Sequence, residues 1–451
     1  MSFWTLARLA QALDGGPADA REIAGITTDT RRIQPGECFV ALKGEQFDAH
    51  DFLGQAVAAG ATALVVSDAR RAAGLGVPVY AVPDTLVALG ALARYRRMAW
   101  GRPVIAVGGS NGKTSTKELL RAVLGSRFTV HATTGNLNNR IGVPLTLLAL
   151  DDAADVAVIE AGTNLPGEIA LLRDIIVPDL TVVTTVQEEH LEGLGDLAGV
   201  MAEEMSLCDR VPVVVVPMSE PHVVREAASR AGRLVAASLP ATHGLHPDGR
   251  GWIDLDGVRM EVPLRGTHNL HNAALVLAVA REFGVAADDV ARGLAAMPAP
   301  PMRSTVLPLG RALLLNDAYN ANPGSARAAL ALLSDIGGAR QRVVVLGTMR
   351  ELGAHSARAH REVAEAALAG RHDLICGIGE FASALRALAL EASIDPRASS
   401  GDSRVITAVD VEDLWPLLAP HLAPDAAILL KASRGVKLER LVPLLTTWAN
   451  A

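Results

Sequence analysis

Cysteine is scarce in this chain of 451 residues, which contains three. Cys38, Cys208 and Cys376 lie far apart, and none belongs to a CxxC pair. By themselves they form neither a disulfide framework nor a zinc knuckle, and so low a content suits a reducing compartment. We therefore expect a cytoplasmic protein.

Long apolar runs are also missing. The longest, such as Val213–Val216, fall far short of the roughly 20 residues that a membrane span requires. Residues 1–13 show no basic segment ahead of an apolar stretch and no cleavage-like site, so we expect no signal peptide. Half of the residues are hydrophobic and a fifth are charged, which argues against disorder over most of the chain.

A surplus of positive charge is absent as well. The formal net charge of −7 argues against a nucleic-acid binder built on a basic surface. Lysine is especially rare, with five lysines against 37 arginines. Because lysine is a compact point charge that fits between phosphate oxygens, each one is a candidate for chemistry that arginine performs poorly. For Lys117 and Lys437, chance survival of a compositional bias is the alternative.

The length predicts about three domains at roughly 150 residues each. Short apolar runs alternate with helical stretches, which indicates parallel α/β layers. We place domain boundaries near residue 100 and at 310/311, the latter after a proline-rich break at Pro298, Pro300 and Pro301. The predicted domains are 1–99, 100–310 and 311–451. Strands are expected at 39–42, 63–66, 104–107, 156–162, 180–186, 211–217, 311–318, 342–348, 373–379 and 426–433.

The most specific local motif is a glycine-rich turn between a strand and a helix. The apolar run 104–107 leads into Gly109-Ser-Asn-Gly-Lys-Thr114 and then into an amphipathic helical stretch. Glycines let backbone N–H groups point at phosphates, and the helix N-terminus adds its positive dipole end. Lys113 would neutralise the β- and γ-phosphates and Thr114 would hold Mg²⁺, so the motif predicts binding of ATP or GTP. The spacing is shorter than the usual phosphate loop, and an ordinary strand-to-helix turn is the alternative.

Further motifs carry a resemblance to a known family over nearly the whole chain. They occupy residues 28–31, 39–44, 109–118, 134–145, 158–169, 189–192, 266–272, 317–323, 346–353 and 430–434. In this order and spacing the chain resembles the Mur ligases, the ATP-dependent amide-bond-forming enzymes of peptidoglycan synthesis. Within the family it is most similar to the member that adds D-alanyl-D-alanine to UDP-N-acetylmuramoyl-tripeptide.

The resemblance implies an α/β architecture of three domains. An N-terminal domain would bind the UDP-sugar, a central phosphate-loop domain would bind ATP, and a C-terminal Rossmann-like domain would close over the nucleotide. The implied partners are the two substrates, with ATP and Mg²⁺ as cofactors and the monomer as the usual state. In the implied reaction the γ-phosphoryl group of ATP activates the tripeptide carboxylate as an acyl phosphate, which the dipeptide amine attacks. The pentapeptide product would serve cell-wall biogenesis, and hence cell shape and division.

The resemblance also implies site residues. The catalytic set is Lys113, Glu160, His190 and Arg303. The ATP-binding set is Gly109, Ser110, Asn111, Gly112, Lys113, Thr114, Ser115, Asn269, Asn272, Asp317, Tyr319, Asn320 and Asn322. The residues implied to bind the UDP-substrate are Asp29, Thr30, Arg31, Lys43, Gly44, Asn136, Asn138 and Asn139. Those implied to bind the dipeptide or the transferring phosphate are Lys431, Ser433 and Arg434. The metal ligands would be Thr114, Glu160, His190 and Glu204.

Local alternatives stay open for several of these residues. Glu160 could be a solvated acid at a strand end, and His190 a structural histidine, because Mg²⁺ prefers oxygen ligands. Asn269 could cap a helix, Arg303 could have an unrelated surface role, and the Asn-Gly-rich run 134–139 could be a plain turn.

One position departs from the family pattern. Mur ligases generally carry a carbamylated lysine in the helix after the His190 region, and an ungapped comparison puts Glu204 there. No lysine lies between Lys117 and Lys431, so a register shift cannot restore one. We hypothesise that Glu204 supplies a fixed carboxylate in place of the carbamate, with Glu203 as the second choice. A smaller departure is Ala49, where the family usually has glycine.

Two rival functions remain at this point. One is another ligase of the superfamily, such as the diaminopimelate- or lysine-adding enzyme or folylpolyglutamate synthase. The other is a non-catalytic nucleotide switch, against which stand three nucleotide-facing segments over two domains. The sequence does not say whether the third residue of the tripeptide is diaminopimelate or lysine.

A fixed carboxylate at Glu204 predicts that ligase activity is independent of CO₂. Turnover in CO₂-depleted buffer is expected to match turnover after bicarbonate is added, because the helix after the His190 region contains no lysine to be carbamylated. Loss of activity on CO₂ depletion, with recovery on adding bicarbonate, would contradict the hypothesis.

Overall fold

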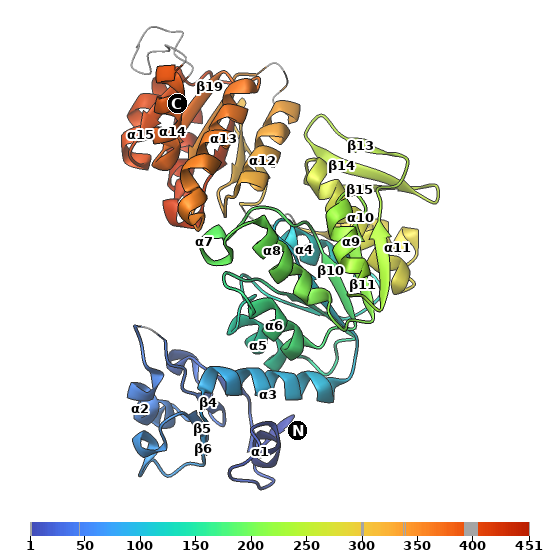
Figure 1. Cartoon of the computed structure of the whole chain (residues 1–451), viewed down its shortest axis with the longest axis vertical. Helices are drawn as coiled ribbons and strands as arrows, with labels where there is room; N and C mark the ends of the chain where they lie inside the picture. The colour runs from blue at the N-terminus through green and yellow to red at the C-terminus, as the bar shows by residue number, and fades with distance from the viewer. Residues whose placement is uncertain are drawn as a thin grey trace. The chain divides into compact units, whose positions relative to one another are not determined.

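The computed structural model describes residues 2–44, 46–298, 302–336, 338, 340–391 and 405–450 (Figure 1). Pro300 and Pro301 of the predicted break therefore lie outside the described residues. The chain divides into two compact units: residues 1–107, 128–162 and 167–181 form the first, and residues 108–127, 163–166 and 182–451 the second. Each unit is described by itself.

The first unit contains a small parallel sheet near the N-terminus. Its described strands run in the order β3 (Ile26–Thr27), β4 (Cys38–Val40), β5 (Ala63–Val66), β6 (Val79–Ala81). Alternate residues of β4 enter two hydrophobic clusters, Cys38 and Val40 on one face and Phe39 on the other, as a strand period of two requires. The neighbouring elements are β1 (Trp4–Thr5), α1 (Leu6–Ala12), β2 (Glu22–Ile23), α2 (Leu53–Ala58) and α3 (Thr85–Trp100).

A larger sheet follows α3. The division into units passes through β10, so the strands are given unit by unit: the first unit holds the order β7-β9-β8, and the second holds β11 beside β12. The strands of this sheet are β7 (Val104–Gly108), β8 (Val130–Ala132), β9 (Val156–Glu160), β10 (Leu180–Val183), β11 (Val213–Pro217) and β12 (Arg233–Ala237). The helices between them are α4 (Lys113–Leu124), α5 (Gly142–Leu148), α6 (Glu168–Ile176), α7 (Leu191–Leu194), α8 (Leu197–Met205) and α9 (Pro221–Ala228). β9 pairs in parallel with β7 and β8, and β11 with β12.

The second unit also contains the C-terminal sheet, whose described strands run β16-β17-β21-β18-β19-β20. Their bounds are β16 (Thr305–Leu309), β17 (Ala312–Asp317), β18 (Arg342–Gly347), β19 (Leu374–Ile378), β20 (Val405–Ala408) and β21 (Ala427–Lys431). The accompanying helices are α10 (Thr267–Glu282), α11 (Ala287–Ala296), α12 (Pro323–Ile336), α13 (Ser356–Ala369), α14 (Glu380–Glu391), α15 (Val411–Leu418) and α16 (Leu441–Ala449).

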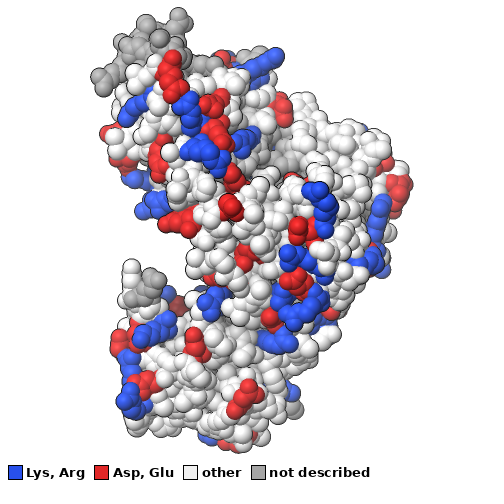
Figure 2. Space-filling model, viewed as in Figure 1, with Lys and Arg blue, Asp and Glu red and all other residues white. Residues whose placement is uncertain are grey.

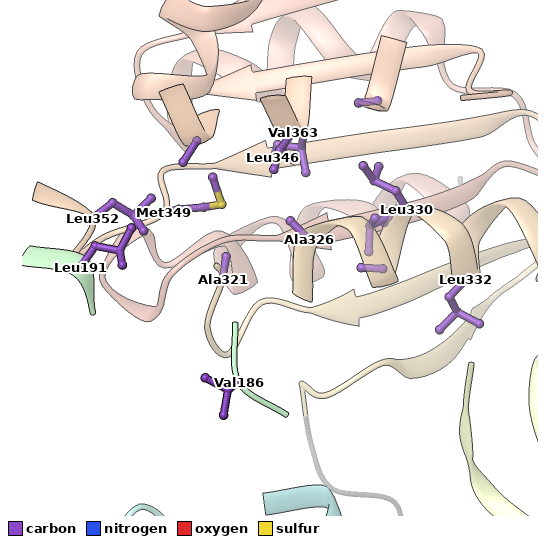
Figure 3. Close-up of a cluster of buried hydrophobic side chains, with 14 of the residues drawn as sticks. Val186, Leu191, Ala321, Ala326, Leu330, Leu332, Leu346, Met349, Leu352 and Val363 are labelled. Atoms are coloured by element: carbon purple, nitrogen blue, oxygen red, sulfur yellow. The ribbon is translucent and has the colours of Figure 1, made fainter. Parts of the chain in front are cut away.

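Helices cover both faces of this C-terminal sheet. Val344 and Leu346 of β18 pack into a cluster with α12, α13 and α14, part of which Figure 3 shows. Val343 and Val345, the alternating residues, pack into another with α15 and α16. Because a strand buried on both faces needs an unbroken apolar run, the segment 342–348 is apolar throughout its centre.

The α/β class is confirmed, and the expected strands exist with small shifts of their ends. The strand expected at 180–186 ends at Val183, and the one expected at 211–217 begins at Val213. The domain boundaries stay a prediction. Three antiparallel features were not predicted: β1 beside β2, β16 beside β17, and a sheet of β13 (His243–Leu245), β14 (Arg250–Leu255) and β15 (Val258–Arg265).

Charged side chains do not gather by sign on the surface in view. On the face drawn in Figure 2, basic and acidic residues are interspersed. Among the described helices, none is both long and apolar enough to cross a membrane.

Candidate active site

The phosphate loop follows β7 and opens α4. Gly109 and Gly112 adopt φ values of 111° and 91°, which side-chain-bearing residues rarely adopt. A Cβ on Gly109 would lie 2.5 Å from Thr184 Oγ1, and one on Gly112 would lie 2.6 Å from Asn272 Oδ1. Both glycines are therefore required by conformation and by space.

Lys113 is the first residue of α4, and its ammonium group turns back onto the loop. It donates to the carbonyl of Gly109 and, at 3.4 Å, to that of Ser110. Two carboxylate oxygens face the same ammonium, Glu189 Oε1 at 3.6 Å and Glu204 Oε1 at 4.0 Å. The loop thus holds a cation among oxygens, close to where the sequence places ATP phosphates.

Glu204 lies against the phosphate loop and is fully buried. Its Oε2 accepts the backbone N–H of Gly109 at 2.7 Å. The neighbouring Glu203 turns elsewhere, since its Oε1 accepts the hydroxyl of Thr163 at 3.2 Å. Of the two candidates for the carbamate position, Glu204 is the one placed at the loop.

Glu189 is a buried carboxyl that the sequence reasoning gave no role. Burial, reinforced by the neighbouring Glu204 carboxylate and opposed by Lys113, raises the pKa of Glu189 to about 7. The sequence feature that could have identified Glu189 as a site residue is its position directly before His190.

His190 is paired with Glu351, another residue without an assigned role. His190 Nδ1 lies 2.6 Å from Glu351 Oε2, and His190 Nε2 lies 3.6 Å from Glu189 Oε2. Burial acts to lower the pKa of His190, but the hydrogen bond to Glu351 and the charge of Glu189 outweigh it, so the pKa is raised. The same hydrogen bond lowers the pKa of Glu351.

Amide side chains connect the loop to segments far along the chain. Asn111 donates to Gln187 Oε1 at 3.0 Å and accepts from the amide of Asn322 at 2.9 Å. In α10 the amide of Asn272 donates to Asn269 Oδ1 at 2.9 Å.

Asn269 does not cap α10, so that alternative was wrong. The N-cap of α10 is Gly266, which places Asn269 inside the first turn, where its amide donates to the carbonyl of Arg265 at 2.8 Å. The capping position needs a non-helical backbone conformation that Asn269 does not have.

A second group of predicted residues meets at the carboxyl ends of β17 and β21. Asp317 Oδ2 lies 2.5 Å from the ammonium of Lys431, and Asp317 Oδ1 accepts the N–H of Ser304 at 2.7 Å. Lys431 also donates to the carbonyl of Asn320 at 2.8 Å. The Arg303 guanidinium lies 4.2 Å from the centre of the Tyr319 ring, a cation–π contact. These five predicted residues are therefore brought together.

The remaining C-terminal candidates lie beside this group. Ser433 accepts the N–H of Arg350 at 2.9 Å and donates to the carbonyl of Ala321 at 3.3 Å. Arg434 is half-exposed and pairs with Glu439 at 3.1 Å.

In the first unit, Glu160 ends β9 and is 2% exposed, so the solvated-acid alternative was wrong. The reason is local, because the amide of Asn138 donates to Glu160 Oε1 at 2.9 Å and covers it. Asn139 Oδ1 accepts the N–H groups of Ile141 and Gly142, at 3.1 and 2.9 Å, where α5 begins.

The predicted uridine-diphosphate residues near the N-terminus are largely exposed. Asp29 pairs with Arg31 at 2.8 Å, and hydrogen bonds from Arg31 lower the pKa of Asp29 to about 2. Thr30 begins the short 3₁₀ turn Thr30–Arg32, and the backbone of Lys43 forms an isolated antiparallel β-bridge with Asp48. Gly44 and Asn136 are exposed.

A glycine-rich loop that opens a helix at the end of a parallel strand defines a phosphate-loop nucleotide-binding protein. Models of the Mur ligase family match three stretches: the catalytic domain at residues 22–97, the middle domain at 107–280 and the glutamate ligase domain at 302–434. The chain belongs to the Mur ligase family.

Similar curated proteins cover the full length. The chain is 36% identical to the UDP-N-acetylmuramoyl-tripeptide–D-alanyl-D-alanine ligase of Escherichia coli over 98% of both chains. It is 32% identical to the Bacillus subtilis ligase of the same name, over 93% of this chain and 92% of that one.

Solved structures agree with this. MurF from Acinetobacter baumannii matches with a TM-score of 0.89 at 30% identity, over 98% of this chain and 99% of that one. MurF from Thermotoga maritima in complex with ADP matches with a TM-score of 0.80 at 25% identity, over 94% and 98%.

The buried carboxyl of Glu189 predicts a pH-dependent stability difference. Its folded pKa of about 7 lies above the ordinary value of 4.5, so the folded state binds more protons between these values. The stability that Glu189 contributes is therefore full below pH 4.5 and is lost as pH rises through 7. Glu189→Gln, which stays neutral, is expected to gain stability relative to the wild type between pH 5 and pH 8.

Urea denaturation of the nucleotide-free chain at the two pH values measures this difference. The exposed neighbour Glu192→Gln serves as the control and is expected to show no such change. An equal difference in unfolding free energy between Glu189→Gln and the wild type at both pH values would refute the assignment.

Proposed function

We propose that this chain joins D-alanyl-D-alanine to UDP-N-acetylmuramoyl-tripeptide at the expense of ATP. The observation that carries the proposal is the full-length similarity to ligases of this name from E. coli and B. subtilis, at 36% and 32% identity. The product is the UDP-N-acetylmuramoyl-pentapeptide precursor of peptidoglycan. Matches to folylpolyglutamate synthase, at 21% identity, and to the diaminopimelate ligase, at 17%, support the shared fold alone.

ATP brings a need for Mg²⁺, and the donor chemistry of the site fits it. Mg²⁺ takes one or two protein carboxylates together with phosphate oxygens and water. Thr114 and Glu160 supply oxygen donors. Glu204 Oε1 is buried, faces Lys113 and has no hydrogen-bond partner among the residues that the structure describes. Among the described residues, no three His, Cys, Asp or Glu side chains are already grouped as a metal site.

We assign Thr114, Glu160, His190 and Glu204 to hold the metal. When bound, Mg²⁺ neutralises phosphate charge and orients the γ-phosphoryl group. We assign the position of the carbamate to Glu204, because its carboxylate already accepts a hydrogen bond from the phosphate loop. The carboxylate of Glu203 instead accepts a hydrogen bond from Thr163.

The first chemical step brings two anions together. A carboxylate oxygen of the tripeptide attacks Pγ, the bond from Pγ to the bridging oxygen breaks, and ADP leaves. Lys113 lies where it can transfer its hydrogen bonds from the carbonyls of Gly109 and Ser110 to phosphate oxygens. Arg303 is proposed as a further cation for the transferring phosphoryl group. The residues of the loop and its neighbours Asn269 and Asn272 position the nucleotide, so positioning and charge stabilisation carry this step.

The second step forms the amide. The dipeptide amine attacks the acyl-phosphate carbon, the tetrahedral intermediate expels phosphate, and the nitrogen loses a proton. We assign Lys431, Ser433 and Arg434 to this end of the site, and Asp317, Tyr319, Asn320 and Asn322 to the adenosine. Asp317 accepts hydrogen bonds from the Lys431 ammonium and from the N–H of Ser304. The contact with Ser304 fixes the backbone next to Arg303.

The UDP end of the substrate is assigned to the first unit. Asp29, Thr30, Arg31, Lys43 and Gly44 supply polar groups, and Asn136, Asn138 and Asn139 supply amides. Asn138 also supports Glu160, and Asn139 also supports the start of α5. Cytoplasmic localisation and a monomeric state remain predictions from the sequence.

The function is tested by phosphate release from ATP and Mg²⁺ with UDP-N-acetylmuramoyl-tripeptide, with and without D-alanyl-D-alanine. Turnover is expected when both substrates are present, with a pentapeptide product identified by mass. Lys113→Ala is expected to lower kcat by about 100-fold or more, because removing a preorganised charge at a transition state typically costs that much. Lys437→Ala, which removes an exposed lysine outside the assigned site, is expected to keep wild-type turnover.

The outcome that overturns the assignment is equally specific. Turnover with another amino acid, or with glutamate and a folate, but none with D-alanyl-D-alanine, would keep the fold and change the function. ATP hydrolysis that ignores every peptide substrate would instead support the nucleotide switch.

A further inference from the structure

The imidazole of His190 is held by a residue far along the chain. Glu351 follows β18, and its Oε2 lies 2.6 Å from His190 Nδ1. The backbone reinforces this pairing, because the N–H of Glu192 donates to the carbonyl of Glu351 at 3.1 Å. Two independent contacts therefore join the segments that carry His190 and Glu351.

Apolar packing lies on one side of these polar contacts, while the Glu351 side chain itself is half-exposed. Leu191, Met349 and Leu352 are buried in one hydrophobic cluster, and Figure 3 shows Leu191 beside Met349 and Leu352. Leu191 and Leu352, which directly follow the two paired residues, are thus kept from water, and their packing fixes the approach of the two segments.

The backbone at both paired residues is strained. His190 has a φ of 49° and Glu351 a φ of 65°, in the left-handed region that residues other than glycine rarely adopt. Such conformations persist only where surrounding contacts determine them, and they concentrate at functional sites. Here the two strained residues are each other's partners.

The loop that carries Glu351 is itself anchored on the C-terminal sheet. The N–H of Met349 donates to Nε2 of the buried His360 at 2.8 Å, and the N–H of Arg350 donates to Ser433 Oγ at 2.9 Å. Glu351 therefore reaches His190 from a fixed base rather than from a free loop.

We propose that Glu351 is a positioning residue that acts through His190. The carboxylate oxygen Oε2, 2.6 Å from Nδ1, favours the proton on that nitrogen, which fixes the tautomer and leaves Nε2 free of a proton and available to the metal. Carboxylates commonly orient ligating histidines in this way. The inference rests on the proposed function in taking His190 as a metal ligand, and it makes the C-terminal loop 349–352 part of what prepares that ligand.

The tautomer of His190 tests the proposal without nucleotide, metal or turnover. The full chain is labelled with [¹⁵N]histidine, and long-range ¹H–¹⁵N spectra are recorded above the titration of the ring, with His190→Gln to identify the signal. In the wild type the proton is expected on Nδ1. Glu351→Ala is expected to move it to Nε2, the form that a free neutral histidine prefers.

Matched variants separate positioning from a general loss of structure. Glu351→Gln keeps an oxygen acceptor at the same place and is expected to retain the Nδ1 proton. Glu192→Ala removes a neighbouring exposed carboxylate and is expected to leave the spectrum unchanged. In the ligase assay, Glu351→Ala is expected to raise the Mg²⁺ concentration for half-maximal turnover about 10- to 100-fold, with a smaller rise for Glu351→Gln.

A His190 tautomer that is the same in the wild type and in Glu351→Ala overturns the proposal. So does a fall in kcat of Glu351→Ala with an unchanged Mg²⁺ requirement. If the wild type fails to ligate D-alanyl-D-alanine, the proposed function fails, while the spectra still decide whether Glu351 sets the tautomer.

Discussion

The hydrogen bond from the backbone N–H of Gly109 to the buried carboxylate of Glu204 ties the phosphate loop to α8, and much of the site depends on it. A buried carboxylate is costly unless it is paired and hydrogen-bonded. Here one oxygen is satisfied by the loop backbone, and the other lies 4.0 Å from the Lys113 ammonium. The same pair of contacts thus offsets the cost of burying Glu204 and fixes the loop that meets the nucleotide.

A second buried charge pair, Lys431 with Asp317, likewise fixes the backbone of a neighbouring segment, at the ends of β17 and β21. Lys431 and Asp317 neutralise each other, and Asp317 also holds the N–H of Ser304, whose φ of 50° is unusual for serine. Arg303 lies between that strained serine and Met302, and it stacks on Tyr319. In both places a carboxylate sets the backbone conformation of a segment that carries a candidate phosphate-binding cation.

Features encoded in short stretches could be predicted from the sequence. The strand, the glycines and Lys113 lie within a dozen residues, and their roles follow from backbone conformation. Glu204 was preferred to Glu203 only on an ungapped comparison, because adjacent residues on a helix point about 100° apart and the rotation of α8 is set by packing. The contact of Asn111 with Asn322 joins residues 211 positions apart and leaves no local pattern.

The antiparallel strands were also not predicted from the sequence, for a different reason. In β14 buried and exposed residues alternate, but Arg250, Trp252 and Asp254 interrupt the apolar signal on which the strand predictions relied. The hairpin that joins β14 to β15 has a local cause, since Asp256 and Gly257 both adopt positive φ, as type I′ turns require. Glu351 was within a recognised motif, yet its partner His190 could be identified only from the folded chain.

The central claim is that ATP activates a carboxylate as an acyl phosphate before the amine attacks. The most direct test uses UDP-N-acetylmuramoyl-tripeptide labelled with ¹⁸O in the carboxylate that is joined to D-alanyl-D-alanine. Mass analysis of the released phosphate is expected to show one ¹⁸O atom per phosphate, because the bond from the acyl carbon to that oxygen breaks when phosphate leaves. Phosphate without label, formed alongside pentapeptide, would contradict the account.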